Sequence, residues 1–346
     1  MLYVTTRDKA NVITSYPTLT ADTGPCGGLY IPFQPLSLSK DELKRLQENS
    51  FCECVADILN MFFSSRLDAW DIASCMGTSP VKLIPMTHKI TVIEIWNNPD
   101  WSFSRFVRNL NGRLIGSADT GEVHNWGNIA IRIAVLFGVF SKVMNSGLIS
   151  DDKTIDLSVV SGDFSTPVAA WYARKMGLPI GNIIFACNEN SESWELMHHG
   201  EANLRTRIKP TLTSQCDVLI PQNMELLIHE TLGEEAVTDF SCAIESKGIY
   251  SLDEEQMQLL NKGIFGAVVG QNRMESIIRN VYATKAYILS PYSALAYGGL
   301  QDYRATKGES RQALILTEHG PLTSDDFVAK AIGITKEALR ERIGAV

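Results

Sequence analysis

Hydrophobic residues along this chain fall into two kinds of segment. Short, mostly apolar runs predict buried strands, which we place at residues 91–96, 154–160, 182–188, 216–221, 286–290 and 312–317. Between most of them, hydrophobic residues at helical spacing predict helices over residues 129–143, 166–176, 224–232, 274–284 and 325–332. Apolar strands separated by helices indicate an α/β fold. We therefore expect a doubly wound, mostly parallel sheet.

The first 80 residues show a different pattern. Residues 1–36 contain short apolar runs broken by turn-forming residues, which predict strands and turns. A helix is expected after Ser39, because Glu42 completes a capping box, and residues 51–62 have hydrophobic side chains at helical spacing. Turn-forming residues at 77–80 mark a boundary. The expected organisation is an N-terminal region over 1–80 and a core domain over 81–346.

Composition narrows the class of protein and of partner. Of the 346 residues, 45% are hydrophobic and 20% are charged, which is typical of a globular protein. The net charge of −8 argues against nucleic acid or an anionic membrane as a partner, because both would repel the chain. The longest apolar run, 129–143, is too short to span a bilayer and contains Arg132 and Lys142, so it predicts a core helix.

The cysteines and the first residues of the chain indicate the cellular compartment. The first residues carry charges where a secretory signal would need an apolar segment. The seven cysteines are scattered and include no closely spaced metal-type pair. We therefore expect reduced thiols, a cytoplasmic protein and no metal site.

One candidate site lies where a predicted strand ends before a helix. The strand over 91–96 breaks at Asn97-Asn98-Pro99, and the next segment places Phe103, Phe106 and Leu110 on one helical face. Loops between strand and helix at one edge of a parallel sheet are where α/β proteins place ligands. This loop is a first candidate for binding or chemistry.

A second loop has the features of an anion site. Before Pro167 opens a helix, it reads Ser161-Gly162-Asp163-Phe164-Ser165-Thr166. Free N–H groups and the helix dipole at such a junction attract phosphate, and the hydroxyl groups add donors. The alternative is that Ser165 or Thr166 only caps the helix. Asp163 favours this alternative, since each unit-charge pair between its carboxylate and a phosphate costs about 4 kcal/mol at about 4 Å.

Six segments, in order along the chain, match the pattern of one enzyme family. They are LYVTTR (2–7), GPCGGLYIP (24–32), SGDFSTPVAAWYARKMGLPIGNIIFACNEN (161–190), TLTSQCDVLIPQNMELL (211–227), SPYSALAYG (290–298) and ILTEHGPLT (315–323). Together they resemble threonine synthase, a fold-type II enzyme dependent on pyridoxal phosphate (PLP). The resemblance implies the tryptophan synthase β-like PLP fold. It also implies PLP as the family's cofactor and lyase chemistry on O-phosphohomoserine in amino-acid biosynthesis.

The residue on which that chemistry depends differs in this chain. In the family, the lysine of ELFHGPTxAFKD forms an imine with the PLP aldehyde. The matching segment here is EIWNNPDWSFSR (94–105), which keeps Glu94, Pro99 and Phe103 and has Ser104 at the lysine position. A serine hydroxyl forms no cationic imine, and Arg105 stays protonated. The resemblance therefore implies no covalently bound PLP, and leaves PLP or a phosphate or sulfate anion as a non-covalent ligand.

The resemblance also assigns the other cofactor positions. It places the pyridine nitrogen opposite Thr317. It places the PLP phosphate at Gly162, Asp163, Phe164, Ser165 and Thr166. Asp163 and Ser165 replace an asparagine and a glycine of the family, which weakens the case for phosphate. His319 lies in a segment that also carries a histidine in the family, and it is the histidine candidate for catalysis.

Most of the family's mobile small domain is expected to be missing, around residues 105–122. GEVHNWGNI (121–129) already resembles the segment that follows this domain. The intervening SADTG (117–121) lacks a strand and helix on either side, and we expect a linker turn. Such a deletion exposes a sheet edge and cleft wall, so a homo-oligomer or another protein partner is expected through this face.

Three functional interpretations follow. The first is a catalytically degenerate threonine synthase homologue that keeps a cleft for a small phosphorylated or amino-acid-like ligand, or acts as an interaction protein. The second is a threonine synthase or related PLP-dependent lyase acting on O-phosphohomoserine. The third is new chemistry in the old cleft that uses Ser104, Asp163 or His319.

Overall fold

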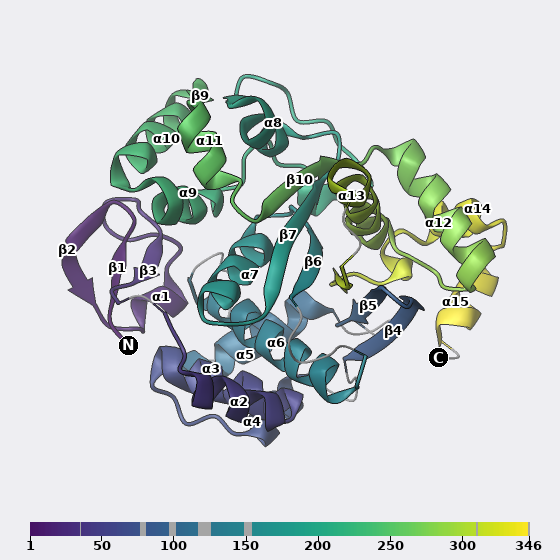
Figure 1. Cartoon of the computed structure of the whole chain (residues 1–346), viewed down its shortest axis with the longest axis horizontal. Helices are drawn as coiled ribbons and strands as arrows, with labels where there is room; N and C mark the ends of the chain where they lie inside the picture. Colours follow the sequence, from purple (N-terminus) through teal and green to yellow (C-terminus); the bar gives the residue numbers. More distant parts are fainter. Residues whose placement is uncertain are drawn as a thin grey trace.

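A six-stranded sheet lies at the centre of the described part of the molecule (Figure 1). The structure is a computed structural model that describes residues 1–34, 36–76, 81–96, 102–116, 126–148, 154–308 and 311–344. The strands lie in the order β10 (Ile264–Val268), β7 (Ile180–Cys187), β6 (Ile155–Val160), β11 (Ala313–Thr317), β5 (Ile90–Glu94) and β4 (Lys82–Thr87). Neighbours are parallel from β10 to β5, and β4 is antiparallel to β5. The expected α/β fold with a mostly parallel sheet is confirmed.

Helices and two small sheets make up the rest of the described elements. The first helices are α1 (Pro17–Thr20), α2 (Lys40–Glu48), α3 (Phe51–Phe63), α4 (Ala69–Met76), α5 (Phe103–Ile115), α6 (Trp126–Asn145), α7 (Ser165–Lys175) and α8 (Glu192–His199). They are followed by α9 (Met224–Leu232), α10 (Glu234–Ser246), α11 (Glu254–Leu260), α12 (Gln271–Lys285), α13 (Pro291–Lys307), α14 (Asp325–Ile332) and α15 (Lys336–Gly344), with 3-10 turns η1 (Ser214–Cys216) and η2 (Pro321–Ser324). The small sheets are β2–β1–β3, built from β1 (Tyr3–Thr5), β2 (Asp8–Ile13) and β3 (Tyr30–Pro32), and β8 (Glu201–Asn203) with β9 (Ile249–Ser251).

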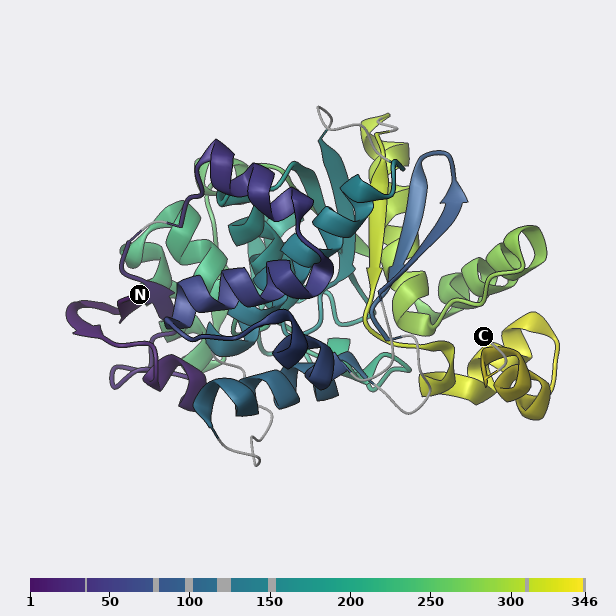
Figure 2. The same ribbon diagram turned by 90° about the horizontal axis from the view of Figure 1, so that it is seen from below.

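Helices cover both faces of the central sheet (Figures 1 and 2). Along β11, Leu314 and Leu316 belong to one buried cluster, whereas Ala313 and Ile315 belong to another. Alternate side chains of this strand therefore face opposite sides. The first cluster includes α3, α6 and α7, and the second includes α12, α13 and α14. The doubly wound arrangement is confirmed.

Helix α6 is the core helix that the apolar run predicted. By length and composition it could cross a membrane, but 89% of its most apolar window is buried inside the protein. The other helices expected from hydrophobic spacing correspond to α7, α9, α12 and α14. Near the N-terminus, the predicted capping box of Ser39 and Glu42 opens α2, and the amphipathic segment after it is α3.

Two predicted strands are wrong. The segment 216–221 forms no strand, because η1 ends at Cys216 and the chain continues as a loop. The segment 286–290 has no strand partner in the described chain, and its last residue, Ser290, caps α13. Cys216 and Leu289 are nevertheless buried in the second cluster. Burial beneath helices, rather than strand pairing, explains the apolar character of both segments.

Three of the elements that were missed contain glycine or proline, which breaks their pattern. Strand β10 contains Gly266, where a side chain would collide with the ring of Phe185. Strand β4 contains Pro85, which is tolerated because β4 is an edge strand. Helix α13 contains Gly298 and Gly299, and Gly299 allows the helix to approach β7 and β10 closely.

The N-terminal region shares its core with the rest of the chain. Tyr3 of β1 and Phe62 of α3 both pack on Trp126 of α6, with ring centroids 6.1 and 6.2 Å apart. The boundary predicted at residues 77–80 lies outside the described residues. The division into 1–80 and 81–346 stays a prediction, and the packing makes one continuous hydrophobic core across it.

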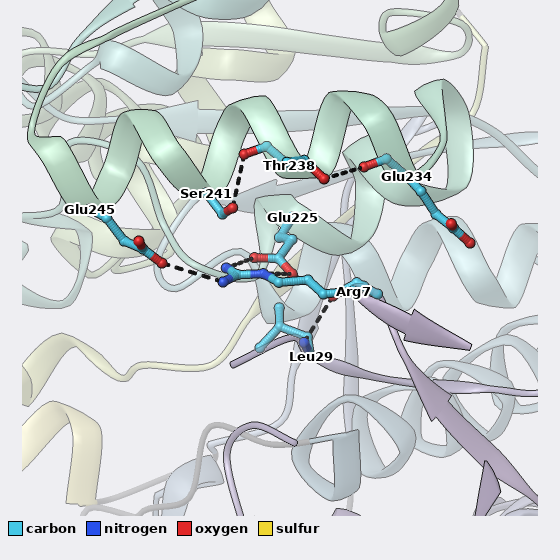
Figure 3. Close-up of polar contacts among 8 residues, drawn as sticks. Arg7, Leu29, Glu225, Glu234, Thr238, Ser241 and Glu245 are labelled. Carbon is cyan, nitrogen blue, oxygen red and sulfur yellow. Dashed lines mark hydrogen bonds and ion pairs between the residues drawn. The ribbon is translucent and has the colours of Figure 1, made fainter. Parts of the chain in front are cut away.

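A buried carboxylate ties the N-terminal strands to α9. The side chain of Glu225 is 1% exposed and accepts hydrogen bonds from Thr6 Oγ1 and from Arg7 Nε (3.2 Å) and Nη2 (2.7 Å). Figure 3 shows Arg7 between Glu225 on α9 and Glu245 on α10, and its Nη1 lies 3.6 Å from Glu245 Oε1. The fork of the guanidinium thus fixes the end of β1 against two helices.

Replacing Glu225 with alanine should lower the free energy of unfolding by about 3 kcal/mol, because Arg7 and Thr6 lose a buried partner. Urea unfolding followed by circular dichroism measures this loss. As a control, Glu234→Ala breaks the exposed pair with Lys9 and should cost less than about 1 kcal/mol. Equal losses in the two variants would contradict a stabilising role for the Glu225 network.

Candidate functional site

A cavity of about 340 Å³ opens where the carboxyl ends of β6 and β11 meet α5 and α6. This is the edge at which open α/β sheets bind ligands, and its size suits a small molecule. Of the residues predicted from sequence, it is lined by Ser104, Gly162, Asp163, Thr166 and His319. The three others, Phe164, Ser165 and Thr317, are buried and do not line it. The loop at 97–101, named as the first candidate, lies outside the described residues.

Asp163 occupies the start of α7. Its carboxylate accepts hydrogen bonds from the N–H of Ser165 (3.0 Å) and from the Ser165 hydroxyl (2.6 Å). The Asn223 amide donates to the Asp163 carbonyl and to Ser165 Oγ, which fixes the loop from outside. The alternative of a cap by Ser165 or Thr166 is wrong, because the carboxylate of Asp163 holds this end of the helix. The N–H and the hydroxyl of Ser165, two donors that would serve a phosphate here, already have an acceptor.

A buried arginine connects three segments at the cavity. Arg132 Nη1 donates to Thr166 Oγ1 (2.8 Å) and to Glu318 Oε1 (2.6 Å), and Thr166 Oγ1 donates to the same carboxylate oxygen (2.6 Å). Burial opposes the charge on Arg132, but the nearby carboxylates of Glu318 and Asp163 outweigh it and raise the pKa of the guanidinium. Within the described part of the chain, Arg132 Nε has no hydrogen-bond partner. Sequence reasoning missed this network, although Arg132 was visible as a charge in an apolar helix.

The hydroxyl of Thr317 is engaged in hydrogen bonds within the protein. It donates to the carbonyl of Ile93 (2.9 Å) and accepts from the indole Nε1 of Trp96 (3.1 Å). The Trp96 ring lies against Gly320, where an added Cβ would come within 2.5 Å of the ring. Thr317 is the residue that the family resemblance places opposite the pyridine nitrogen, and an indole N–H already donates to it.

Three further polar groups of the cavity, His319, Cys216 and Ser104, are uncharged at pH 7. Burial lowers the pKa of His319, which outweighs the opposing effect of Glu318, and its ring packs on Tyr292 with centroids 4.2 Å apart. Burial raises the pKa of Cys216 to about 12, so this group is a thiol rather than a nucleophilic thiolate. Ser104 lies in the first turn of α5, which the hydroxyl of Ser102 caps.

These residues do not fit PLP as the family holds it. No lysine lines the cavity among the described residues, and the sequence has none at 97–101 or 117–125. At the phosphate positions, the carboxylates of Asp163 and Glu318 take up donors and would repel a dianion. Within the described residues, the lining therefore offers no amine for an imine, and two carboxylates occupy the phosphate positions.

Comparison with known proteins shows similarity to threonine synthases. Residues 2–79 match the threonine synthase N terminus family. Human threonine synthase-like 1 is 25% identical over 205 residues, which covers 58% of this chain and 27% of the human protein. Threonine synthase of Saccharomyces cerevisiae is 26% identical over 224 residues, or 60% of this chain and 43% of the yeast protein. The chain thus matches less than half the length of these curated relatives.

Solved structures agree on the fold. PLP-bound threonine synthase from Brucella melitensis has a TM-score of 0.86 at 17% identity, over 99% of this chain and 94% of that chain. Yeast threonine synthase has a TM-score of 0.83 at 19% identity, over 100% and 94% of the two chains. This chain is thus similar to threonine synthases and threonine synthase-like proteins in sequence, and it shares the fold of the solved threonine synthases.

Proposed function

We propose that this chain is a threonine synthase-like protein that has lost PLP catalysis and binds a small amino-acid-like ligand non-covalently. The observation that carries the proposal is the lining of the 340 Å³ cavity. Among the described residues it offers guanidinium groups and carboxylates but no lysine. A cytoplasmic location belongs to the same proposal, supported by seven cysteines that are all free thiols.

Opposite charges in the cavity favour a zwitterion. Arg108 and Arg132 present guanidinium groups to a ligand carboxylate, and the buried Nε–H of Arg132 needs an acceptor. Asp163 and Glu318 present acceptors to an ammonium group. An amino acid satisfies both sets of groups. A phosphorylated ligand meets the two carboxylates and is disfavoured by repulsion.

Two alternative functions would use the same cavity. A PLP-dependent lyase acting on O-phosphohomoserine needs an amine, and the described lining supplies none. New chemistry in the old cleft is favoured by one observation, a neutral His319 that lines the same cavity as Ser104 and Asp163. A neutral imidazole accepts a proton at pH 7, as a general base must. Turnover of O-phosphohomoserine above a blank would support either alternative over the inert protein.

The purified protein mixed with PLP should show only the absorption of the free aldehyde. Borohydride should leave no pyridoxyl group on the protein, as checked by intact mass. The reason is the absence of a lysine at the cavity. A reducible imine band assigned by peptide mapping to a lysine would overturn the loss of PLP catalysis.

The double variant Ser104→Lys, Asp163→Asn is the matched comparison. It restores an amine beside the cavity and removes one carboxylate from the phosphate positions. PLP should bind this variant at least about tenfold more tightly than the parent chain, in line with removal of one like-charge contact. No change in affinity would show that the cofactor cavity has been placed wrongly.

Replacing Glu318 with glutamine should invert the choice of ligand. The change removes an acceptor for ammonium and frees the positive charge of Arg132. Calorimetry should show threonine binding weakened by about tenfold or more and inorganic phosphate binding strengthened. Glu201→Gln, at an exposed position on β8, is the control and should change neither. Unchanged affinities in Glu318→Gln would refute the zwitterion assignment.

We also propose self-association through the face beside α5. Trp70 of α4 is 70% exposed there, with the Arg113 guanidinium 5.6 Å from its ring centre. Light scattering should give a mass above one chain, and Trp70→Ser should reduce it. Ile249→Ser, on exposed β9, is the control and should leave the mass unchanged. A single-chain mass at every concentration would contradict this proposal.

A further inference from the structure

A second cavity, of about 240 Å³, lies between the N-terminal sheet and helices α7 and α9. Figure 1 shows β1 to β3 beside α9. Apolar side chains from β1, β3 and the segment after β3 form its walls, namely Val4, Ile31, Pro32, Phe33 and Leu36. Polar groups from β2, α7 and α9 form the rest of the cavity lining. No residue of this cavity lines the first one.

His229 of α9 is an unsatisfied group in this cavity. Its side chain is 8% exposed, and neither ring nitrogen has a hydrogen-bond partner among the described residues. The nearest carboxylate oxygen, Glu230 Oε1, is 3.9 Å from Nδ1, which is beyond hydrogen-bond reach. A buried polar group left without a partner costs about 1–3 kcal/mol. A ligand with a hydrogen-bonding head would recover this cost.

The charged groups around the cavity are arranged in pairs. Lys175 Nζ lies 2.7 Å from Glu230 Oε2, and Tyr172 donates to the other oxygen of that carboxylate at 3.1 Å. The acceptors of Glu230 are thus engaged. Lys9 of β2 is the second cation of the lining, and its partner Glu234 belongs to α10 outside the lining. Because each of these cations is paired with a carboxylate, an anion in the cavity needs a proton on the His229 imidazole as its counter-charge.

We propose that this cavity is a binding site for a small organic monocarboxylate with an apolar body. The carboxylate lies at His229, within the field of the two lysines, and the apolar part contacts the walls contributed by β1 and β3. A neutral imidazole donates from one nitrogen only, so the bound carboxylate favours a second proton on the ring. Binding is then accompanied by proton uptake at His229.

The surroundings of His229 set the direction of the pH effect. Burial lowers the pKa of the free imidazole. The charged groups around it are Glu225 and Glu230 on α9, Glu234 on α10, Lys9 on β2 and Lys175 on α7. A bound carboxylate adds a negative charge and raises the pKa again. Affinity should therefore increase as the pH falls from about 8 to about 6, where the ligand is still ionised.

Benzoate is a suitable probe, with benzamide as its uncharged analogue. In the full-length protein, benzoate should shift the imidazole signals of His229 in NMR spectra and raise its pKa, whereas benzamide should bind at least about tenfold more weakly. Calorimetry in buffers of different ionisation enthalpy should show proton uptake. Binding of benzoate without proton uptake and without a shift at His229 would overturn the assignment.

Variants separate this site from the first cavity. His229→Gln should weaken benzoate binding by about tenfold or more, because it removes the group that takes up the proton. Lys175→Met, at a side chain that is 40% exposed, should weaken benzoate binding similarly. Lys40→Met, at an exposed position of α2, is the control and should leave benzoate binding unchanged. Shifts at His319 instead of His229, or equal affinity in His229→Gln and the parent, would overturn the proposal. So would the absence of binding at millimolar benzoate in the parent chain.

Discussion

The requirement that a buried guanidinium be paired decides what the first cavity accepts. Arg132 projects from a helix that is otherwise almost wholly apolar, and Glu318 neutralises it at 2.6 Å while Thr166 bridges the two. Because both side chains are only 12% exposed, separating them would leave an unpaired charge in a poorly solvated place. The pair therefore stays together, and its carboxylate stays at the start of α7, where a phosphate would otherwise be held. Asp163 adds a second carboxylate to the same turn.

At the position that the family resemblance assigns to the pyridine nitrogen, the Thr317 hydroxyl is already hydrogen-bonded. The hydroxyl of Thr317 is satisfied by the Ile93 carbonyl and the Trp96 indole, so a pyridine nitrogen would compete with two internal hydrogen bonds. Ser104 stands at the family's lysine position, and Asp163 and Ser165 differ from the family at the phosphate positions. Thr317, which the family resemblance places at the ring nitrogen, already makes two hydrogen bonds within the chain.

Features that arise from a pattern within one segment could be predicted from the sequence, whereas contacts between distant segments could not. Helical spacing found α6, α7, α9, α12 and α14, because burial of one face imposes a local period. The sheet order and the edge position of β4 involve strands far apart in the chain, and proline and glycine hid β4 and β10. In the site, the 161–166 loop was found from its place before a predicted helix, whereas Ser104 was found because the family resemblance supplied a frame. Arg132 with Glu318 was not, since a pair separated by 186 positions has no signature in either segment. Trp96 was read as part of a strand, and only its contact with Thr317 shows its role.

The N-terminal region and the second cavity depend on the same helix. Glu225 and His229 are four residues apart on α9, so both lie on the side of the helix that faces the N-terminal strands. The ion pair with Arg7 holds those strands at the distance that leaves a cavity in front of the imidazole. The buried carboxylate that stabilises the fold therefore also positions the strands that form the cavity walls near His229.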